Sequence, residues 1–307
     1  MTLQQLRFMV EIVRNQFSIT QAAIVLHTSQ PAISKQVRLL EQELQIQLFR
    51  RVGKRLVDLT AEGKKVFSYA ERILTDSANI RHVGEEFISD SQGGLTISTT
   101  PTLASYILPM AVKHFKEKYP DVRLHIVVGE SDQSVATLIS GEADISIVPR
   151  LEGIPKEHAR FRCFHWKRSL IALPDCPLLT AKRITLEMLA EYPIIAFETP
   201  AVSLKSIFTA NGLSPTYAIT TSNPEVMKAY VSLGMGIGII ASATYNKEKD
   251  APLVARDVSK LIKGIDILAI VPRRAYLRSY TYEFIALIAP HLKQKKITDE
   301  LLRMNFN

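Results

Sequence analysis

Polar and basic side chains recur at helical spacing in one short stretch of the sequence, TSQPAISKQVR at positions 28–38. Ser29 is placed to cap a helix, and Pro31 suits the first turn of that helix. Four further side chains would share its solvent face: Gln30, Ser34, Lys35 and Arg38. An amide can bond the edge of adenine, a hydroxyl can bond several bases, and cations suit phosphate or guanine. The chemistry expected of this face is recognition of double-stranded DNA.

Four basic residues cluster in the segment after this helix, LFRRVGKRLVDL at positions 48–59. The segment is expected to form two short strands around Val52-Gly53-Lys54, because a glycine-containing turn separates two strand-like runs. The basic residues of this hairpin are Arg50, Arg51, Lys54 and Arg55. Cations on a hairpin beside a recognition helix fit contacts with the DNA backbone or the minor groove.

Apolar stripes mark the helices that must hold these residues in place. The first helix has its stripe at Leu3, Leu6, Val10 and Val13, and the third at Ile33, Val37, Leu40 and Leu44. Ser18 can cap a second helix between them, and its alanines permit close packing. The order of these elements predicts a winged helix-turn-helix domain over residues 1–59.

A long helix is expected after this domain, over residues 60–90, with Thr60 as its cap. Apolar and small residues alternate four and three apart along it, at Val66, Ala70, Ile73, Ser77, Ile80, Gly84 and Phe87. This spacing is typical of a coiled-coil seam and therefore of a dimer. The alternative is a helix that packs only on its own chain. The sequence SDSQGG at 89–94 is typical of a linker.

Strand-like and helix-like segments alternate from residue 91 to residue 307, which indicates an α/β domain with a largely parallel sheet. The length and the two groups of strands predict two lobes. The first lobe is expected at about 91–162 and 267–307, and the second at about 163–266. The segment YTYEFIALIAPHL near the C-terminus predicts an amphipathic helix on the first lobe.

Composition narrows the class of protein. The net charge of the chain is +8, and residues 1–90 carry 12 Lys and Arg against 10 Asp and Glu. The total charge therefore does not single out the N-terminal segment, and DNA binding is inferred from the local arrangement of its basic residues. Two cysteines, Cys163 and Cys176, do not form a disulfide framework or a zinc site, and no metal or cofactor is expected. Charged residues interrupt the first apolar segment, and no uncharged apolar run approaches the ~20 residues of a membrane helix. A cytoplasmic protein without membrane contact is expected.

No P-loop, nucleophile elbow or HExxH motif is present in the sequence, and GMGIGII at 234–240 lacks GxGxxG spacing. The chain is therefore not expected to be an enzyme. A rival interpretation is an enzyme or solute-binding protein that uses the α/β lobes, with the N-terminal segment as an interaction module; no catalytic set supports it.

The N-terminal segment FMVEIVRNQFSITQAAIVLHTSQPAISKQVRLLEQELQIQLFRR, followed by LTAEG, resembles the DNA-binding domain of LysR-type transcriptional regulators. The remainder resembles the effector domain of the same family, two lobes akin to periplasmic binding proteins. The segments RFRCFHWKRSLIALP and AYVSLGMGIGIIAS are similar to the CysB type, which controls sulfate or sulfonate assimilation and responds to acetylated serine, sulfate or related small anions, so a small anionic effector of this kind is expected. The resemblance implies promoter DNA as partner, dimers through the linker helix and usually homotetramers. RNA polymerase is a further candidate partner.

An effector site is predicted where the strand LTIST ends and a helix begins after Pro101-Thr102. Hydroxyls and free N–H groups at a helix start suit an anion, and the alternative is that Thr100 or Thr102 serves only as a helix cap. The resemblance implies that Thr100, Thr102 and Trp166 match residues that bind the anion in the CysB type.

Three positions depart from that branch. Pro101 and Leu103 stand where it has His and Gln, and Pro149 stands where it has Thr. Arg150 is a candidate partner for a carboxylate or sulfonate, with a surface arginine as the alternative. Thr199 and Ser203 are offered as replacements for polar groups of a longer loop. These departures keep open a LysR-type regulator of another pathway, such as carboxylate or aromatic catabolism.

Overall fold

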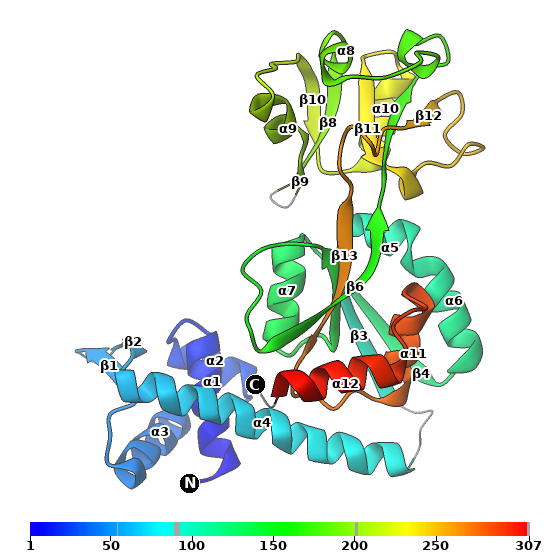
Figure 1. Cartoon of the computed structure of the whole chain (residues 1–307). Coiled ribbons are helices and arrows are strands. Elements are labelled where there is room, and N and C mark those ends of the chain that lie inside the picture. The colour runs from blue at the N-terminus through cyan, green and yellow to red at the C-terminus, as the bar shows by residue number, and fades with distance from the viewer. Residues whose placement is uncertain (54, 89–92, 200–201, 306–307) are drawn as a thin grey trace. The chain divides into compact units, whose positions relative to one another are not determined.

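The computed structural model describes residues 1–53, 55–88, 93–199 and 202–305. The chain divides into two compact units (Figure 1). The N-terminal unit is Met1–Asp90 with Arg274–Tyr276, and the C-terminal unit is Ser91–Arg273 with Leu277–Asn307.

The N-terminal unit contains three short helices, a hairpin and a long helix. Its elements are α1 (Leu3–Arg14), α2 (Ile19–Val25), α3 (Gln30–Leu44), β1 (Phe49–Val52), β2 (Arg55–Leu59) and α4 (Ala61–Ile88). The hydroxyls of Thr2, Ser18 and Ser29 accept backbone N–H bonds at the starts of α1, α2 and α3. Each cap satisfies an amide that a helix start leaves without a partner. The predicted winged helix-turn-helix is confirmed.

The predicted apolar stripes of α1 and α3 form the core of this unit. Leu6, Val10, Ile33 and Val37 are almost completely buried, whereas Leu3, at the first residue of α1, is exposed. Burial of each such side chain stabilises the fold by roughly 1.5–3 kcal/mol. The core therefore fixes which face of α3 remains in solvent.

The hairpin and α4 meet at a close joint. The Thr60 backbone N–H donates to the Leu48 carbonyl at 3.0 Å, and the Thr60 hydroxyl accepts from the Gly63 N–H at 2.9 Å, which confirms Thr60 as the helix cap. A Cβ at position 63 would stand 2.0 Å from the Leu48 carbonyl oxygen. The first turn of α4 therefore requires glycine, because any side chain would push the hairpin away.

The predicted seam of α4 divides between two environments. Val66 and Ala70 pack on the core of their own unit, as the alternative interpretation expected. Ile73 and Ile80 are 36% and 74% exposed, so these two described residues of the distal seam are open to solvent to an increasing degree. Residues 89–92 of the predicted linker lie outside the described residues, and Gly93 and Gly94 open the next strand.

The first lobe of the C-terminal unit is a five-stranded sheet with helices on both faces (Figure 1). Its strands, in spatial order, are β4 (Val122–Val128), β3 (Gly93–Thr99), β5 (Ile145–Pro149), β13 (Ile265–Pro272) and β6 (His158–Trp166). Its helices are α5 (Pro101–Tyr106), α6 (Leu108–Lys118), α7 (Ser131–Ile139), α11 (Ser279–Ile288) and α12 (Gln294–Asn305).

The second lobe has a sheet of five strands in one path, with a short sixth strand, β9 (Val202–Ser203), on β8. The path is β10 (Tyr217–Thr221), β8 (Ile194–Thr199), β11 (Ile237–Ala241), β7 (Arg168–Ala172) and β12 (Val254–Asp257). Its helices are η1 (Pro177–Leu179), α8 (Leu186–Ala190), α9 (Leu204–Ala210), α10 (Pro224–Ser232) and η2 (Ser242–Thr244).

Both sheets are mixed, and the prediction of a largely parallel sheet is wrong in this respect. In the first lobe β3 pairs parallel with β4 and β5, but β13 pairs antiparallel with β5 and β6. In the second lobe β8 pairs parallel with β10 and β11, but β7 pairs antiparallel with β11 and β12. The antiparallel strands are those by which the chain passes between the lobes, from β6 to β7 and from β12 to β13. The predicted lobe boundary at 162–163 falls inside β6, which runs to Trp166.

The predicted amphipathic helix near the C-terminus is α11, and it packs on the first lobe. The rings of Phe284 in α11 and Phe115 in α6 meet edge to face with centroids 5.4 Å apart. The helix α12 was not predicted from the sequence, although Ile297 and Leu301 are buried and stand at helical spacing. Among the described helices, none is both long enough and apolar enough to cross a membrane.

Candidate functional site

The solvent face of α3 carries the residues predicted to contact DNA. Gln30, Lys35 and Arg38 are exposed and Ser34 is half-buried, while Ile33 and Val37 face the core. Ser29 is exposed and caps the helix by accepting from the Ala32 N–H at 3.3 Å, and Pro31 lies in the first turn. The helix therefore offers an amide, a hydroxyl and two cations to the solvent. These groups are of the kinds that contact base edges and phosphates when a helix lies in the major groove.

Arg51 has a partner inside the fold. Its Nη2 lies 3.2 Å from a carboxylate oxygen of Glu41, which is only 6% exposed. The other Glu41 oxygen accepts the backbone N–H bonds of Leu48 at 2.9 Å and Phe49 at 3.3 Å. A buried carboxylate needs such partners, so Arg51 helps to hold the start of the hairpin on α3.

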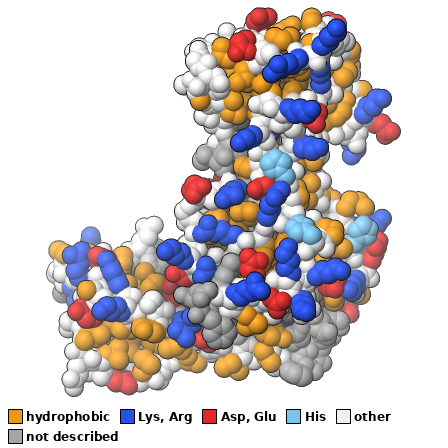
Figure 2. Space-filling view, in the orientation of Figure 1, with side chains coloured by type: hydrophobic (Ala, Val, Ile, Leu, Met, Phe, Trp, Pro, Cys, Tyr) orange, Lys and Arg blue, Asp and Glu red, His pale blue; other side chains and the backbone are white. Residues whose placement is uncertain are grey.

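The other hairpin cations differ in their surroundings. Arg50 is exposed and pairs with Asp58 at 3.2 Å. Arg55 is exposed and makes no ion pair with any residue that the structure describes. Lys54 lies outside the described residues. Figure 2 shows Lys and Arg side chains interspersed with acidic ones on the N-terminal unit, and among the placed hairpin cations Arg55 is best suited to a phosphate.

A cleft lies between the two lobes of the C-terminal unit, where parallel strands end. Its walls come from residues that follow or end β3, β4, β5, β8, β10 and β11, which is where ligands of open α/β sheets bind. The lining residues of the first lobe are Thr100, Pro101, Thr102, Glu130, Ser131 and Pro149, and those of the second lobe are Phe197, Thr199, Ser222, Pro224, Ile240, Ala241 and Thr244. Trp166, Arg168 and Ile265 line it where the chain passes between the lobes. The volume open to the centre of a water molecule is about 50 Å³.

The hydroxyl of Thr100 is not used as a helix cap. Thr100 occupies the N-cap position of α5 and is 8% exposed, but its side chain makes no capping hydrogen bond. The strand end beneath it is rigid, because the Thr99 hydroxyl donates to the Ile147 carbonyl at 2.6 Å and the Ser134 hydroxyl donates to the Thr99 carbonyl at 3.0 Å. Thr100 and Thr102 therefore present hydroxyls from a fixed wall of the cleft.

Arg168 lines the cleft and was missed in the sequence analysis, which proposed Arg150 as the cation. Arg150 is not among the lining residues: it is 66% exposed, and its Nη1 lies 3.8 Å from Asp266. Arg168 stands two residues after Trp166 in FHWKRS, and such alternation along an extended chain was the signal that could have identified it. Burial lowers the pKa of the Arg168 guanidinium.

Of the other residues discussed for the effector site, some line the cleft and others do not. Trp166, Pro149 and Thr199 line the cleft. Ser203 does not line it and instead caps α9 by accepting from the Ser206 N–H at 3.3 Å. Leu103 is completely buried in the first lobe and does not line it either. Glu130, Ser131, Ser222 and Thr244 are polar lining residues that the sequence analysis did not single out.

A buried lysine connects the two lobes beside the cleft. Lys228 of α10 donates to the Tyr106 hydroxyl at 3.1 Å, to the Thr244 carbonyl at 3.0 Å and to Asp250 at 2.9 Å. Tyr106 belongs to the first lobe, and its ring centroid lies 5.3 Å from the Lys228 ammonium. The side chains of Lys228 and Asp250 are each 7% exposed. The lobes therefore share a desolvated cation, whose hydrogen bonds reach both of them.

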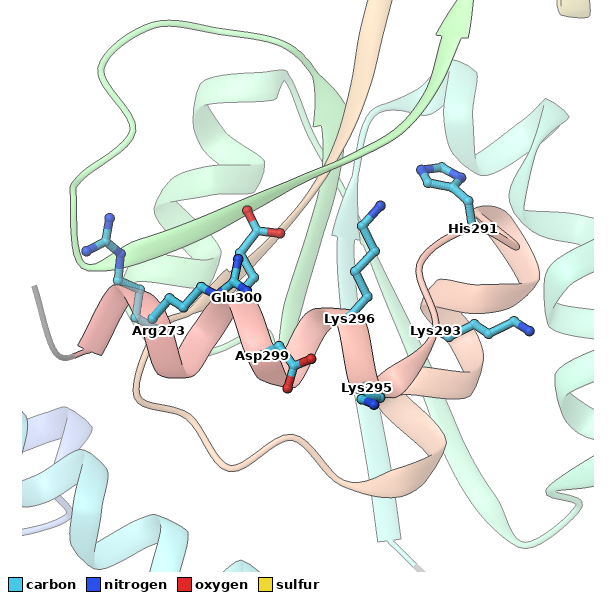
Figure 3. Close-up of a pocket in the computed structure, with 8 residues that line it drawn as sticks. Arg273, His291, Lys293, Lys295, Lys296, Asp299 and Glu300 are labelled. Carbon is cyan, nitrogen blue, oxygen red and sulfur yellow. The ribbon is translucent and has the colours of Figure 1, made fainter.

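A larger concavity of about 940 Å³ lies over α12 in the first lobe. Figure 3 shows Lys295, Lys296, Asp299 and Glu300 on α12, with His291 and Lys293 before it. Lys293, Lys295 and Lys296 are exposed, and acidic groups lie among them. This arrangement is that of a solvated mixed-charge surface, so we assign it no ligand.

Both cysteines are free thiols, and no cluster of metal-binding side chains occurs among the described residues. Burial raises the pKa of the Cys163 thiol to about 12, so it stays protonated and is a poor nucleophile.

Family models match both units of the chain. The model described as "Bacterial regulatory helix-turn-helix protein, lysR family" matches residues 3–64, and that described as "LysR substrate binding domain" matches residues 89–293. The chain belongs to the LysR family.

LysR-type relatives match along nearly the whole length of the chain. The transcriptional regulator CysB of Haemophilus influenzae is 38% identical, over 99% of this chain and 95% of that protein. The regulator SsuR of Burkholderia cenocepacia is 37% identical over 97% of each, and cbl of Escherichia coli is 35% identical over 98% and 96%.

Solved LysR structures share the fold. The cofactor-binding domain of the Cbl regulator is 31% identical, with a TM-score of 0.64, over 69% of this chain and 94% of that one. Full-length OxyR of Pseudomonas aeruginosa, at 21% identity, has a TM-score of 0.68 over 94% of each chain. This chain is therefore a LysR-type, DNA-binding transcriptional regulator rather than an enzyme, and its second unit is a domain that binds a small molecule.

Replacement of Gln30 in this LysR-type regulator separates base reading from phosphate binding. We expect Gln30→Ala to lower discrimination between the operator and random DNA by about 1–3 kcal/mol. Arg55→Ala should weaken both complexes alike and reduce the slope of log affinity against log salt by about 1. Fluorescence anisotropy with both DNAs over a salt series measures these effects. The reverse pattern would show that the contacts are misassigned.

Replacement of Lys228 tests the bridge between the lobes. Lys228→Met should lower the free energy of unfolding of the effector domain by about 3–5 kcal/mol, because Asp250 stays buried without its cation. Tyr106→Phe removes one hydrogen bond and should cost about 0.5–1.5 kcal/mol. Urea denaturation followed by Trp166 fluorescence reports on this domain, and the exposed Lys249→Met is the matched control. A loss for the control as large as that for Lys228→Met would contradict the assignment.

Proposed function

We propose that this LysR-type regulator acts in the cytoplasm on promoters of sulfur (sulfate or sulfonate) assimilation genes, and that a small anion in the interlobe cleft controls it. The observation that carries the proposal is the chemistry of the cleft. Hydroxyls of Thr100 and Thr102, the indole of Trp166 and the guanidinium of Arg168 all line one small space. Similarity to CysB, SsuR and Cbl regulators over the full chain supports the pathway.

Dimerisation through α4 is part of the proposal. Ile73 and Ile80 are exposed on the distal half of the seam, and a second copy of α4 would cover them. Two winged helices on one dimer suit a dyad-symmetric operator, in which the half-sites are one or more helical turns apart. Effector domains would join two dimers into a homotetramer, and promoter-bound protein would contact RNA polymerase.

The effector acts by a difference in affinity. A ligand changes promoter occupancy only if it binds one arrangement of the tetramer more tightly than the other. The Lys228 bridge supplies a closed state of the lobes for the ligand to favour, since it lies beside the cleft and joins both walls.

A second candidate is control of another pathway with a carboxylate effector. Pro101 and Pro149 line the cleft at positions where the CysB type has polar side chains, so the cleft is less polar than that branch predicts. Arg168 would serve a carboxylate as well as a sulfonate.

Replacement of Ile80 tests the dimer. We expect Ile80→Glu to shift the protein towards monomers and to weaken operator binding, because like charges would meet across the seam. Ile80 is 74% exposed, so the fold of the chain should not change. Sedimentation velocity measures the association state. Met110→Glu, at a site 59% exposed on α6, is the control; an unchanged dimer in Ile80→Glu would place the interface elsewhere.

Ligand screening tests the effector. The full chain is melted with sulfate, thiosulfate, O-acetylserine, N-acetylserine, sulfonates and dicarboxylates. A ligand at ~100 times its Kd stabilises the folded state by about 2.7 kcal/mol and raises Tm. We expect a sulfur compound or an acetylserine to raise Tm and to change the footprint on the promoter. A rise with dicarboxylates alone would assign the regulator to another pathway.

A further inference from the structure

Arg168 is a cation in a partly desolvated setting without an internal counterion. It begins β7 and lines the cleft. Its guanidinium makes no ion pair or hydrogen bond with the residues that the structure describes, and burial is the cause of its lowered pKa. Arginine stays charged even so. An anion that enters the cleft would therefore meet a guanidinium that makes no ion pair with the described residues.

A second donor stands beside it in the sequence. Trp166 is 6% exposed, and its Nε1 has no hydrogen-bond partner among the described residues. The indole nitrogen only donates, and a buried donor without an acceptor destabilises the unliganded state. Because Trp166 also lines the cleft, a ligand oxygen is the acceptor that the site lacks.

The opposite wall limits the charge of the ligand. It is formed by Thr100, Thr102 and Ser131, but also by Glu130. The charged residues among those that line the cleft are thus Arg168 and Glu130. The starts of α5, α7 and α10 add only the partial positive charges of helix ends. One negative charge on a ligand is balanced by Arg168, whereas a second would be repelled by Glu130.

The size of the cleft limits the ligand as well. About 50 Å³ is open to the centre of a water molecule, which is room for roughly three to five waters. A headgroup of a few heavy atoms fills this space without separating the lobes.

We propose that Arg168 and the indole N–H of Trp166 hold the charged end of the effector, and that this end is a small monovalent oxyanion, a sulfonate or a carboxylate. Glu130 disfavours the doubly charged sulfate. This inference rests on the proposed function in taking the cleft as the effector site, and it goes further in naming the charge of the ligand and the residues that read it.

The test is a titration of the full chain with methanesulfonate, acetate, sulfate and the neutral methanesulfonamide. Trp166 is the single tryptophan of the chain, so its fluorescence reports on the cleft directly; calorimetry gives an independent affinity. We expect the two monovalent anions to bind more tightly than sulfate and than the sulfonamide.

Matched variants separate a role in ligand binding from a role in stability. Arg168→Gln should lower affinity for methanesulfonate and acetate by about 10- to 100-fold, the range for a lost hydrogen bond to a charged group. It should also remove the preference for methanesulfonate over methanesulfonamide, which a general loss of stability would leave in place. Arg168→Lys should retain part of the affinity, since it keeps the charge but loses the planar fork. Glu130→Gln should raise the affinity for sulfate, and Arg150→Gln should behave as the wild type.

The outcomes distinguish this inference from the proposed function. If Arg168→Gln binds the monovalent anions as the wild type does, or if sulfate binds the wild type more tightly than they do, the inference is overturned while the cleft remains an anion site. If no oxyanion binds the wild type by either method, the anionic effector of the proposed function falls, and this inference falls with it. The Tm of unliganded Arg168→Gln, compared with those of the wild type and of Arg150→Gln, shows that the effector domain of the variant is folded.

Discussion

The pairing of β6 with β13 is the constraint on which the C-terminal unit depends. The chain leaves the first lobe at the end of β6 and returns to it at the start of β13, and Ile265 lies opposite Trp166 where the two strands meet. A Cβ at Gly264 would stand 1.8 Å from the Trp166 carbonyl oxygen, so this close approach needs glycine. The same pairing places Trp166 against the cleft and starts β7 at Arg168. Backbone hydrogen bonding between these two strands thereby positions the cleft side chains that we propose to meet the effector.

A comparable constraint organises the N-terminal unit. The buried carboxylate of Glu41 binds two backbone amides at the start of the hairpin and one guanidinium on its first strand. The cost of burying this charge is offset only while all three partners stay in place. The angle between α3 and the hairpin thus depends on this ion pair, and among the described basic residues of the hairpin Arg51 maintains the fold while Arg50 and Arg55 remain in solvent.

Much of this architecture could be predicted from periodicity and caps. The stripe of Ile33 and Val37 identified the buried face of α3, and Thr60 marked the start of α4, because both signals are local. The effector cation could not be assigned in the same way. Arg150 and Arg168 both stand beside strand ends, and the choice between them depends on Asp266, a residue distant in sequence that pairs with Arg150. The mixed sheets were missed for a similar reason, since β13 returns from the second lobe to pair with β5 and β6.

The glycine at the start of α4 has a mechanical consequence. With no side chain at position 63, the Leu48 carbonyl rests directly on the first turn of the helix, and this contact has no flexible side chain that can yield. We therefore expect the hairpin and the long helix to move together as a rigid body. In the dimer that we propose, a small turn of one α4 against the other would swing the wing through an arc set by the length of that helix, and the spacing of the DNA half-sites would follow the angle between the two helices.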